Sequence, residues 1–137
     1  MINKKELIDK AKEAALENFC CIHSNFTVGT ALLTKSGKIY KGFNVENDGI
    51  QSICGERSAF VNALLDGEKE FLAIAIVGKN VKDKLFTKTV PCGYCRQFMS
   101  EYATKELIVY TYDDETEEYY EYTLAKLLPE NFGFESK

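Results

Sequence analysis

The 137-residue chain contains no cluster of lysine and arginine, no long apolar run, and only one histidine and two prolines. Its 17 basic residues are outnumbered by 21 acidic ones, giving a formal net charge of −4. This balance disfavours a polynucleotide partner. No apolar run approaches the roughly 20 residues that a membrane-spanning helix needs, so we expect no membrane partner.

The compartment and the domain organisation follow from the same composition. The charged start, Met1 to Leu7, is typical of a helix and not of a signal peptide, which predicts a cytoplasmic protein. The length and a hydrophobic content of 45% fit a single globular domain over residues 1–137.

Five cysteines, two of them in a Cys-x-x-Cys motif, favour metal or redox chemistry over disulfides in a cytoplasmic protein.

Apolar periodicity predicts an α/β fold of three layers, with a mixed five-stranded sheet between helices on both faces. Residues 4–19 have the spacing of an amphipathic helix, and residues 26–33 and 39–45 that of a β-hairpin. The uninterrupted apolar run at 71–78 predicts a strand buried on both faces. Further predicted elements are helices beginning at Cys54 and Pro91, strands at 107–110 and 119–122, and a helical turn at 124–128.

A metal site is indicated at the start of the Pro91 helix. Proline suits a first helical turn because its φ is preset and it has no N–H to leave unpaired. Cys92 and Cys95 can then face one point, where the positive end of the helix dipole favours thiolates. A third cysteine, Cys54, opens the preceding helix. Three thiolates can hold Zn²⁺ and leave its fourth tetrahedral position to water.

A carboxylate completes this constellation. Glu56 follows Cys54 by two residues and can move the proton of a water beside the metal. Zinc lowers the pKa of such a water to about 7, which supplies hydroxide at neutral pH. Arg57 and Arg96 adjoin the two ligand segments and are candidates for pairing with ligand sulfur, offsetting the charge of three thiolates.

Further motifs lie in order along nearly the whole chain. They are Ser24-Asn25-Phe26, Val28-Gly29-Thr30-Ala31-Leu32-Leu33, Asn44-Val45-Glu46-Asn47, Cys54-Gly55-Glu56-Arg57, Pro91-Cys92-Gly93-Tyr94-Cys95-Arg96-Gln97 and Leu127-Leu128-Pro129. This ordered set resembles the small zinc-dependent cytidine deaminases, the homotetrameric kind with three cysteine ligands. The resemblance implies hydrolysis of cytidine or deoxycytidine to uridine or deoxyuridine and ammonia, a reaction of pyrimidine salvage.

The resemblance also implies roles for individual residues. Zn²⁺ would be held by Cys54, Cys92 and Cys95, and Glu56 would shuttle protons to N3 of cytosine and to the departing ammonia. The ribose hydroxyls of the nucleoside would be held by Asn44 and Glu46. The remaining substrate contacts would come from Phe26 near the base, the backbone of Gly55, and Phe132, reaching into the site of a neighbouring subunit.

Two departures from the family pattern concern the substrate site. Gly55 stands where the family usually has alanine, and its backbone N–H remains available. The segment from Asn47 to Cys54 is one residue shorter than usual and lacks a tyrosine often found there. This keeps open a related deaminase acting on another cytosine-bearing compound, such as blasticidin S.

Other classes of protein could use parts of the same pattern. The Cys92/Cys95 pair could be the redox pair of a dithiol oxidoreductase, although Cys54 and Glu56 would then have no role. A closed structural zinc site would need a fourth ligand from Cys20, Cys21 or His23, as in a non-enzymatic partner-binding module. An RNA- or DNA-editing deaminase is disfavoured by the acidic chain. Alone, Cys20 and Cys21 are typical of buried small hydrophobes.

Overall fold

The computed structural model describes residues 1–49 and 51–133, and the described residues form four helices and six strands. In chain order these are α1 Lys4–Glu17, β1 Phe26–Thr34, β2 Ile39–Phe43, α2 Gly55–Leu65, β3 Phe71–Asn80, β4 Thr87–Lys88, α3 Gly93–Tyr102, β5 Ile108–Asp113, β6 Glu118–Thr123 and α4 Leu124–Leu127. None of the helices in this described part is long and apolar enough to cross a membrane.

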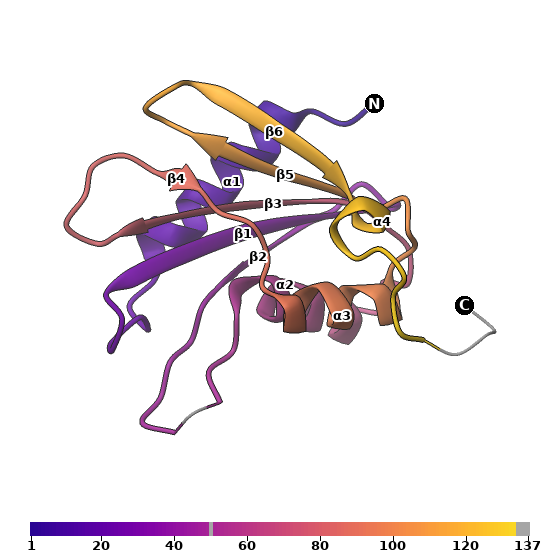
Figure 1. Cartoon of the computed structure of the whole chain (residues 1–137), viewed down its shortest axis with the longest axis horizontal. Coiled ribbons are helices and arrows are strands. Elements are labelled where there is room, and N and C mark those ends of the chain that lie inside the picture. Colours follow the sequence, from indigo (N-terminus) through magenta and orange to yellow (C-terminus); the bar gives the residue numbers. More distant parts are fainter. Residues whose placement is uncertain (50, 134–137) are drawn as a thin grey trace.

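The strands form one mixed sheet in the order β2-β1-β3-β5-β6 (Figure 1). β1 pairs antiparallel with β2 and β3, whereas β3 and β5 are parallel and β5 and β6 antiparallel. The mixed sheet predicted from the sequence is confirmed, but the predicted count of five strands is one too low. The sixth strand, β4, is only two residues long and pairs with the end of β3. Two exposed residues carry no periodic apolar signal that the sequence could show.

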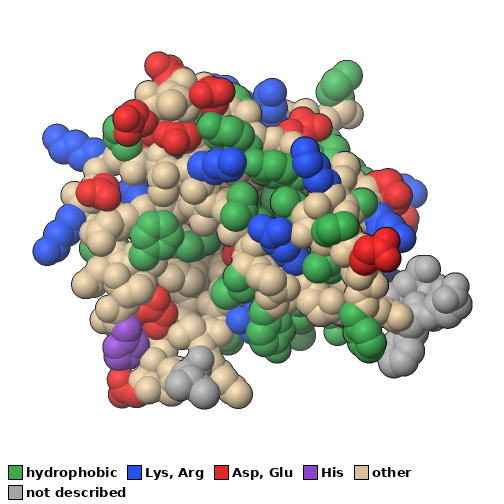
Figure 2. All heavy atoms as spheres, viewed as in Figure 1, with side chains coloured by type: hydrophobic (Ala, Val, Ile, Leu, Met, Phe, Trp, Pro, Cys, Tyr) green, Lys and Arg blue, Asp and Glu red, His purple; other side chains and the backbone are tan. Residues whose placement is uncertain are grey.

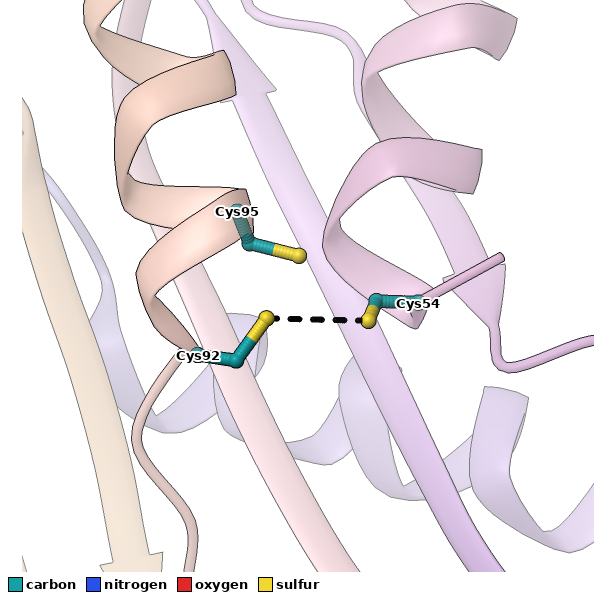
Figure 3. A group of neighbouring side chains, drawn as sticks. All are labelled: Cys54, Cys92 and Cys95. Carbon is teal, nitrogen blue, oxygen red and sulfur yellow. Dashed lines mark hydrogen bonds between the residues drawn. The ribbon is translucent and has the colours of Figure 1, made fainter. Parts of the chain in front are cut away.

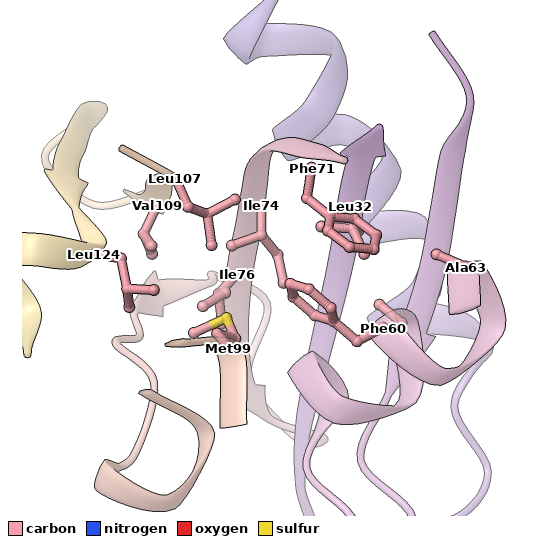
Figure 4. Close-up of a cluster of buried hydrophobic side chains, with 11 residues drawn as sticks. Leu32, Phe60, Ala63, Phe71, Ile74, Ile76, Met99, Leu107, Val109 and Leu124 are labelled. Carbon is pink, nitrogen blue, oxygen red and sulfur yellow. The ribbon is translucent and has the colours of Figure 1, made fainter. Parts of the chain in front are cut away.

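Helices cover both faces of the sheet, as predicted. Figure 1 shows α1 on one side of the sheet and α2 and α3 on the other. Alternate β3 residues supply the two cores because side chains of a strand point to opposite faces. Ala73, Ala75 and Val77 pack in the α1 core, while Ile74 and Ile76 pack against α2 and α3 (Figure 4). The strand buried on both faces is therefore confirmed.

Helix boundaries follow local caps. The Asn3 side chain accepts a hydrogen bond from the Glu6 N–H and starts α1. The helix ends at Glu17, two residues before the predicted end, because Asn18 takes an extended conformation as its C-cap. Phe19 then projects outward, with 81% of its surface exposed. Cys54 and Cys92 are the N-caps of α2 and α3, so the predicted α2 start holds to within one residue and the predicted α3 start to within two.

Helix α1 packs on β1 at a position where only glycine fits. A Cβ on Gly29 would lie 2.0 Å from the Ala11 carbonyl oxygen and 2.4 Å from the Ala15 nitrogen. Because these atoms are backbone, the helix itself would have to move. We expect Gly29→Ala to cost at the upper end of about 1–3 kcal/mol of unfolding free energy, measured by urea denaturation. Gly93→Ala is the control, since nothing lies within 4 Å of its added Cβ, and an equal loss there would contradict the prediction.

Candidate metal centre and active site

Three cysteine sulfurs converge where α2 and α3 begin side by side (Figure 3). The Sγ atoms of Cys54, Cys92 and Cys95 all lie within 4.8 Å of one another, and those of Cys54 and Cys92 are 3.9 Å apart. Cys92 is exposed, Cys54 half-buried and Cys95 fully buried. The structure thus brings together the three predicted ligands from segments far apart in the sequence.

The spacing of these sulfurs fits zinc. Two thiolates bound at about 2.3 Å with a tetrahedral angle between them lie roughly 3.8 Å apart. The Cys54–Cys92 separation of 3.9 Å is close to this value. In the described residues, the potential ligand group contains only these three cysteines, so Cys20, Cys21 and His23 do not supply the fourth ligand of a closed site. The set leaves one tetrahedral position for water.

The pKa values of the Cys54 and Cys95 thiols shift in opposite directions when no metal is bound. A hydrogen bond from Cys95, together with smaller contributions from Arg57 and Cys92, lowers the pKa of Cys54 to about 5 against the opposing effect of burial. The hydrogen bond to Cys54 and burial raise the pKa of Cys95. Cys54 therefore ionises more readily than Cys95 when no metal is bound, and a divalent cation would favour the thiolate form of its ligands.

Glu56 lies in the first turn of α2 with only 4% of its surface exposed. Burial, with a smaller contribution from the negative charge of Cys54, raises the pKa of its carboxyl to about 7. A carboxyl with a pKa close to 7, beside a cluster of potential metal ligands, can both accept and donate a proton near pH 7. The position and the protonation behaviour suit an acid/base role and not that of a zinc ligand.

Arg57 contacts ligand sulfur, as its place in the sequence predicts. Its Nη2 lies 3.7 Å from Cys54 Sγ and donates to the Ser52 carbonyl at 3.0 Å. Its guanidinium carbon lies 4.3 Å from the centre of the ring of Tyr94, a residue that stands between Cys92 and Cys95 in the sequence. These contacts place the positive charge of Arg57 beside Cys54 Sγ, where it favours the thiolate form.

Arg96 does not take the position expected of it. Its Nε donates to the Pro91 carbonyl at 2.8 Å and its Nη1 to the Leu127 carbonyl at 2.8 Å. These carbonyls occupy the guanidinium, so the expectation that Arg96 pairs with ligand sulfur is wrong. Through these two hydrogen bonds, Arg96 links the start of α3 to the end of α4.

The glycine between the first ligand and Glu56 has a local explanation. A Cβ on Gly55 would lie 3.1 Å from Thr30 Cγ2 and 3.4 Å from the Val28 carbonyl oxygen. The Thr30 methyl group thus fills the space toward which an alanine side chain would point. The Thr30 hydroxyl also donates to the Gly55 carbonyl at 2.8 Å, which fixes the start of α2 on β1.

Asn44 and Glu46 lie next to each other just beyond β2. The Nδ2 of Asn44 donates to the Phe26 carbonyl at 2.9 Å and lies 3.5 Å from Glu46 Oε2. Glu46 accepts from the backbone N–H groups of His23 and Ser24 and from the Ser24 hydroxyl. Although partial burial opposes it, these bonds lower the pKa of Glu46. The sequence prediction that the two side chains share one site is consistent with this geometry.

The remaining predicted residues are less tightly placed. Phe26 is half-buried at the start of β1, and its ring lies against Gly78, where a Cβ would approach it to 2.8 Å. Phe132 is 75% exposed, and its carbonyl accepts from Gln97. His23 is exposed and pairs with Asp48 at 3.1 Å. Cys21 is buried and Cys20 half-buried, in line with the hydrophobic interpretation.

Sequence reasoning missed two side chains next to these residues. Tyr94 stacks on Arg57, and Asn18 donates to Asn44 Oδ1 at 2.7 Å. A tyrosine between two ligands could have been noted as a stacking partner for an adjacent arginine. Nothing in the sequence links Asn18 to Asn44, because the contact depends on where α1 ends.

Comparison with known proteins identifies the family of the chain. A family model described as the cytidine and deoxycytidylate deaminase zinc-binding region matches residues 1–111. The cytidine deaminase of Sporosarcina psychrophila is 37% identical over 132 residues, covering 96% of this chain and 92% of the relative. That of Halalkalibacterium halodurans is 33% identical over 133 residues, covering 96% of each chain.

Solved structures give the same result. The cytidine deaminase of Burkholderia pseudomallei superposes with a TM-score of 0.82 at 34% identity, covering 96% of this chain and all of the other. That of Mycobacterium tuberculosis gives a TM-score of 0.80 at 29% identity, covering 98% of this chain and all of the other. The dithiol oxidoreductase interpretation is therefore set aside. With its three converging thiols and buried Glu56, the chain belongs to the cytidine and deoxycytidylate deaminase family of zinc-binding proteins.

Proposed function

We propose that this protein hydrolyses the C4 amino group of cytidine and deoxycytidine, giving uridine or deoxyuridine and ammonia. The observation that carries the proposal is the buried carboxyl of Glu56. It follows Cys54 by two residues, and Cys54 belongs to a cluster of three potential zinc ligands. Family membership and the names of the relatives support the choice of reaction.

The chemistry divides between the metal and the chain. Zinc bound by Cys54, Cys92 and Cys95 would supply an activated water at neutral pH. Glu56 would take one proton of that water and pass it to N3 of cytosine, then carry the proton of the hydroxyl added at C4 to the departing amino group, leaving the C4 carbonyl of uridine and ammonia. Its burial removes this carboxyl from bulk solvent, and Arg57 would offset the negative charge of the thiolates.

The nucleoside would be held by residues around the end of β2. Asn44 and Glu46 would bind ribose hydroxyls, Phe26 would lie near the base, and the Gly55 backbone would contact the pyrimidine. The support for this is the common location of Asn44, Glu46 and Phe26, whose groups are joined by hydrogen bonds of 2.9 and 3.5 Å. A rise in KM on replacing Asn44 by alanine is the measurement that tests the sugar contact.

The chain would act as a single domain that assembles into a homotetramer, in which Phe132 completes the site of a neighbour. Phe132 is 75% exposed, so its ring is available to contact a neighbouring subunit. Light scattering of the purified protein measures the oligomer. Its compartment would be the cytoplasm, where the reaction would serve pyrimidine salvage.

No nucleic acid partner is proposed. Acidic and basic side chains are interspersed on the face seen in Figure 2, and a net charge of −4 would repel a phosphate backbone. This favours a free nucleoside over a cytosine within a strand.

The experiment that tests the proposal follows the ultraviolet spectrum of cytidine incubated with zinc-loaded protein, together with ammonia release. We expect conversion to uridine, and no conversion after a chelator has removed the metal. Blasticidin S is incubated in parallel, because the segment from Asn47 to Cys54 is short. Turnover of blasticidin S with unchanged cytidine would replace the nucleoside assignment, and turnover of neither by zinc-bound protein would favour a non-enzymatic module.

A further inference from the structure

Asn18 ends α1 and lies beside the proposed sugar-binding residues, although no motif includes it. Its Nδ2 lies 2.7 Å from Asn44 Oδ1, 3.1 Å from Thr27 Oγ1 and 3.2 Å from the Asn44 carbonyl oxygen, so its two N–H groups are shared among three acceptors. Thr27 Oγ1 in turn donates to the Ala15 carbonyl at 2.8 Å, so its lone pair is available to Asn18. The amide is thus held by α1, β1 and the segment after β2 together.

These contacts fix which way the Asn44 amide faces. Asn44 Oδ1 accepts from Asn18 Nδ2 and also from the Val28 N–H at 2.9 Å. A carbonyl oxygen has two lone pairs, and both are occupied here. The Nδ2 of Asn44 must then lie on the other side, where one N–H meets the Phe26 carbonyl and the second faces Glu46. A reversed amide would set a nitrogen against two donors.

Asn18 also reaches Glu46 through the backbone of Cys20. The Cys20 N–H donates to Asn18 Oδ1 at 2.7 Å, and the Cys20 carbonyl accepts from the Glu46 N–H at 3.0 Å. The two ends of one side-chain amide therefore hold the two proposed sugar ligands. The Nδ2 end sets the side chain of Asn44, and the Oδ1 end sets the backbone of Glu46.

We propose that Asn18 is a positioning residue for the nucleoside sugar, orienting Asn44 directly and Glu46 through Cys20. The inference rests on the proposed sugar-binding role of Asn44 and Glu46. Asn18 touches neither the cysteine cluster nor Glu56 in the described contacts, so its effect falls on binding of the sugar and not on proton transfer.

The test compares Asn18→Ala and Asn18→Asp with the unmodified zinc-loaded protein. We expect KM for cytidine to rise about tenfold in both, the order of one lost hydrogen bond, with kcat changing less than KM. Asn18→Asp is informative because it keeps the size of the side chain and its acceptor for Cys20, yet loses the donor to Asn44. Zinc content and the thermal midpoint show that each variant is folded.

Asn62→Ala is the matched control. The Asn62 amide also donates to a backbone carbonyl, that of Lys41, at 3.1 Å, but it lies on the exposed face of α2. Its KM should stay within about twofold of the unmodified value. An equal rise in KM in this variant would mean that the assay reports general loosening, which would overturn the proposal.

A double-mutant cycle with Asn44→Ala separates this proposal from the one on which it rests. If Asn18 acts through Asn44, adding Asn18→Asp to Asn44→Ala should change KM by less than about twofold. If Asn44→Ala raises KM while both Asn18 variants leave it unchanged, or if the two effects multiply, the positioning role is wrong. If Asn44→Ala itself leaves KM unchanged, the proposed sugar contact fails and the role of Asn18 fails with it.

Discussion

Replacing Glu56 by alanine is expected to lower kcat for cytidine by at least about 10²–10⁴-fold, the range typical of losing a general acid/base. The buried carboxyl is the group near the three cysteines that is poised to take up and release a proton, with a pKa of about 7 when no metal is bound. The measurement is single-turnover deamination followed by absorbance, with zinc quantified in the same sample.

Glu56→Gln is the matched variant for this prediction. It keeps the volume of the side chain at a site that is 4% exposed, so it avoids the cavity that alanine leaves. Because an amide cannot transfer the proton, its kcat should fall as steeply, while zinc content stays that of the unmodified protein. Normal turnover by either variant would remove Glu56 from the mechanism.

Replacing Cys92 by alanine is expected to lower zinc affinity by more than about 100-fold, since even residues that only support metal ligands are worth about 10–100-fold. Activity should fall at least as far as in the Glu56 variants. Cys92 is the exposed member of the cluster, so its removal leaves the buried core intact. Metal analysis after dialysis and a competition titration with a chromogenic chelator measure the loss.

Cys20→Ala provides the comparison, because it removes a half-buried thiol that lies outside the cluster. Its zinc content and its kcat should match those of the unmodified protein. The thermal midpoint of the Cys92 variant should also fall, since metal bound only by the folded chain adds to its stability. Full zinc retention by Cys92→Ala would mean that this thiol is not a ligand.

The metal centre could be predicted from the sequence because each part of it is local. Cys92 and Cys95 share one helical turn, and Cys54 and Glu56 share another. Each pair is placed by the geometry of a helix start, which three or four residues determine. That the two helix starts meet depends on the sheet, and it was expected from the resemblance to the zinc-dependent cytidine deaminases.

Other features depend on contacts between distant segments and could not be predicted. Arg96 adjoins a ligand in the sequence, yet its guanidinium meets the carbonyl of Leu127, 31 residues further along the chain. Asn18 acts on Asn44 because α1 stops at Glu17 and its C-cap falls beside β1. The two-residue strand β4 is likewise set by its partner β3 and not by its own composition.

The division of the ligands between two helices has a consequence during synthesis on the ribosome. Cys54 precedes Cys92 by 38 residues, and strand β3 lies between them. A nascent chain that ends between Cys54 and Cys92 has one of the three clustered thiols, whereas Cys92 and Cys95 emerge almost together. Capture of zinc by the three proposed ligands would therefore wait until α3 has been translated and has docked against α2, which would make metal uptake a late step in the maturation of this protein.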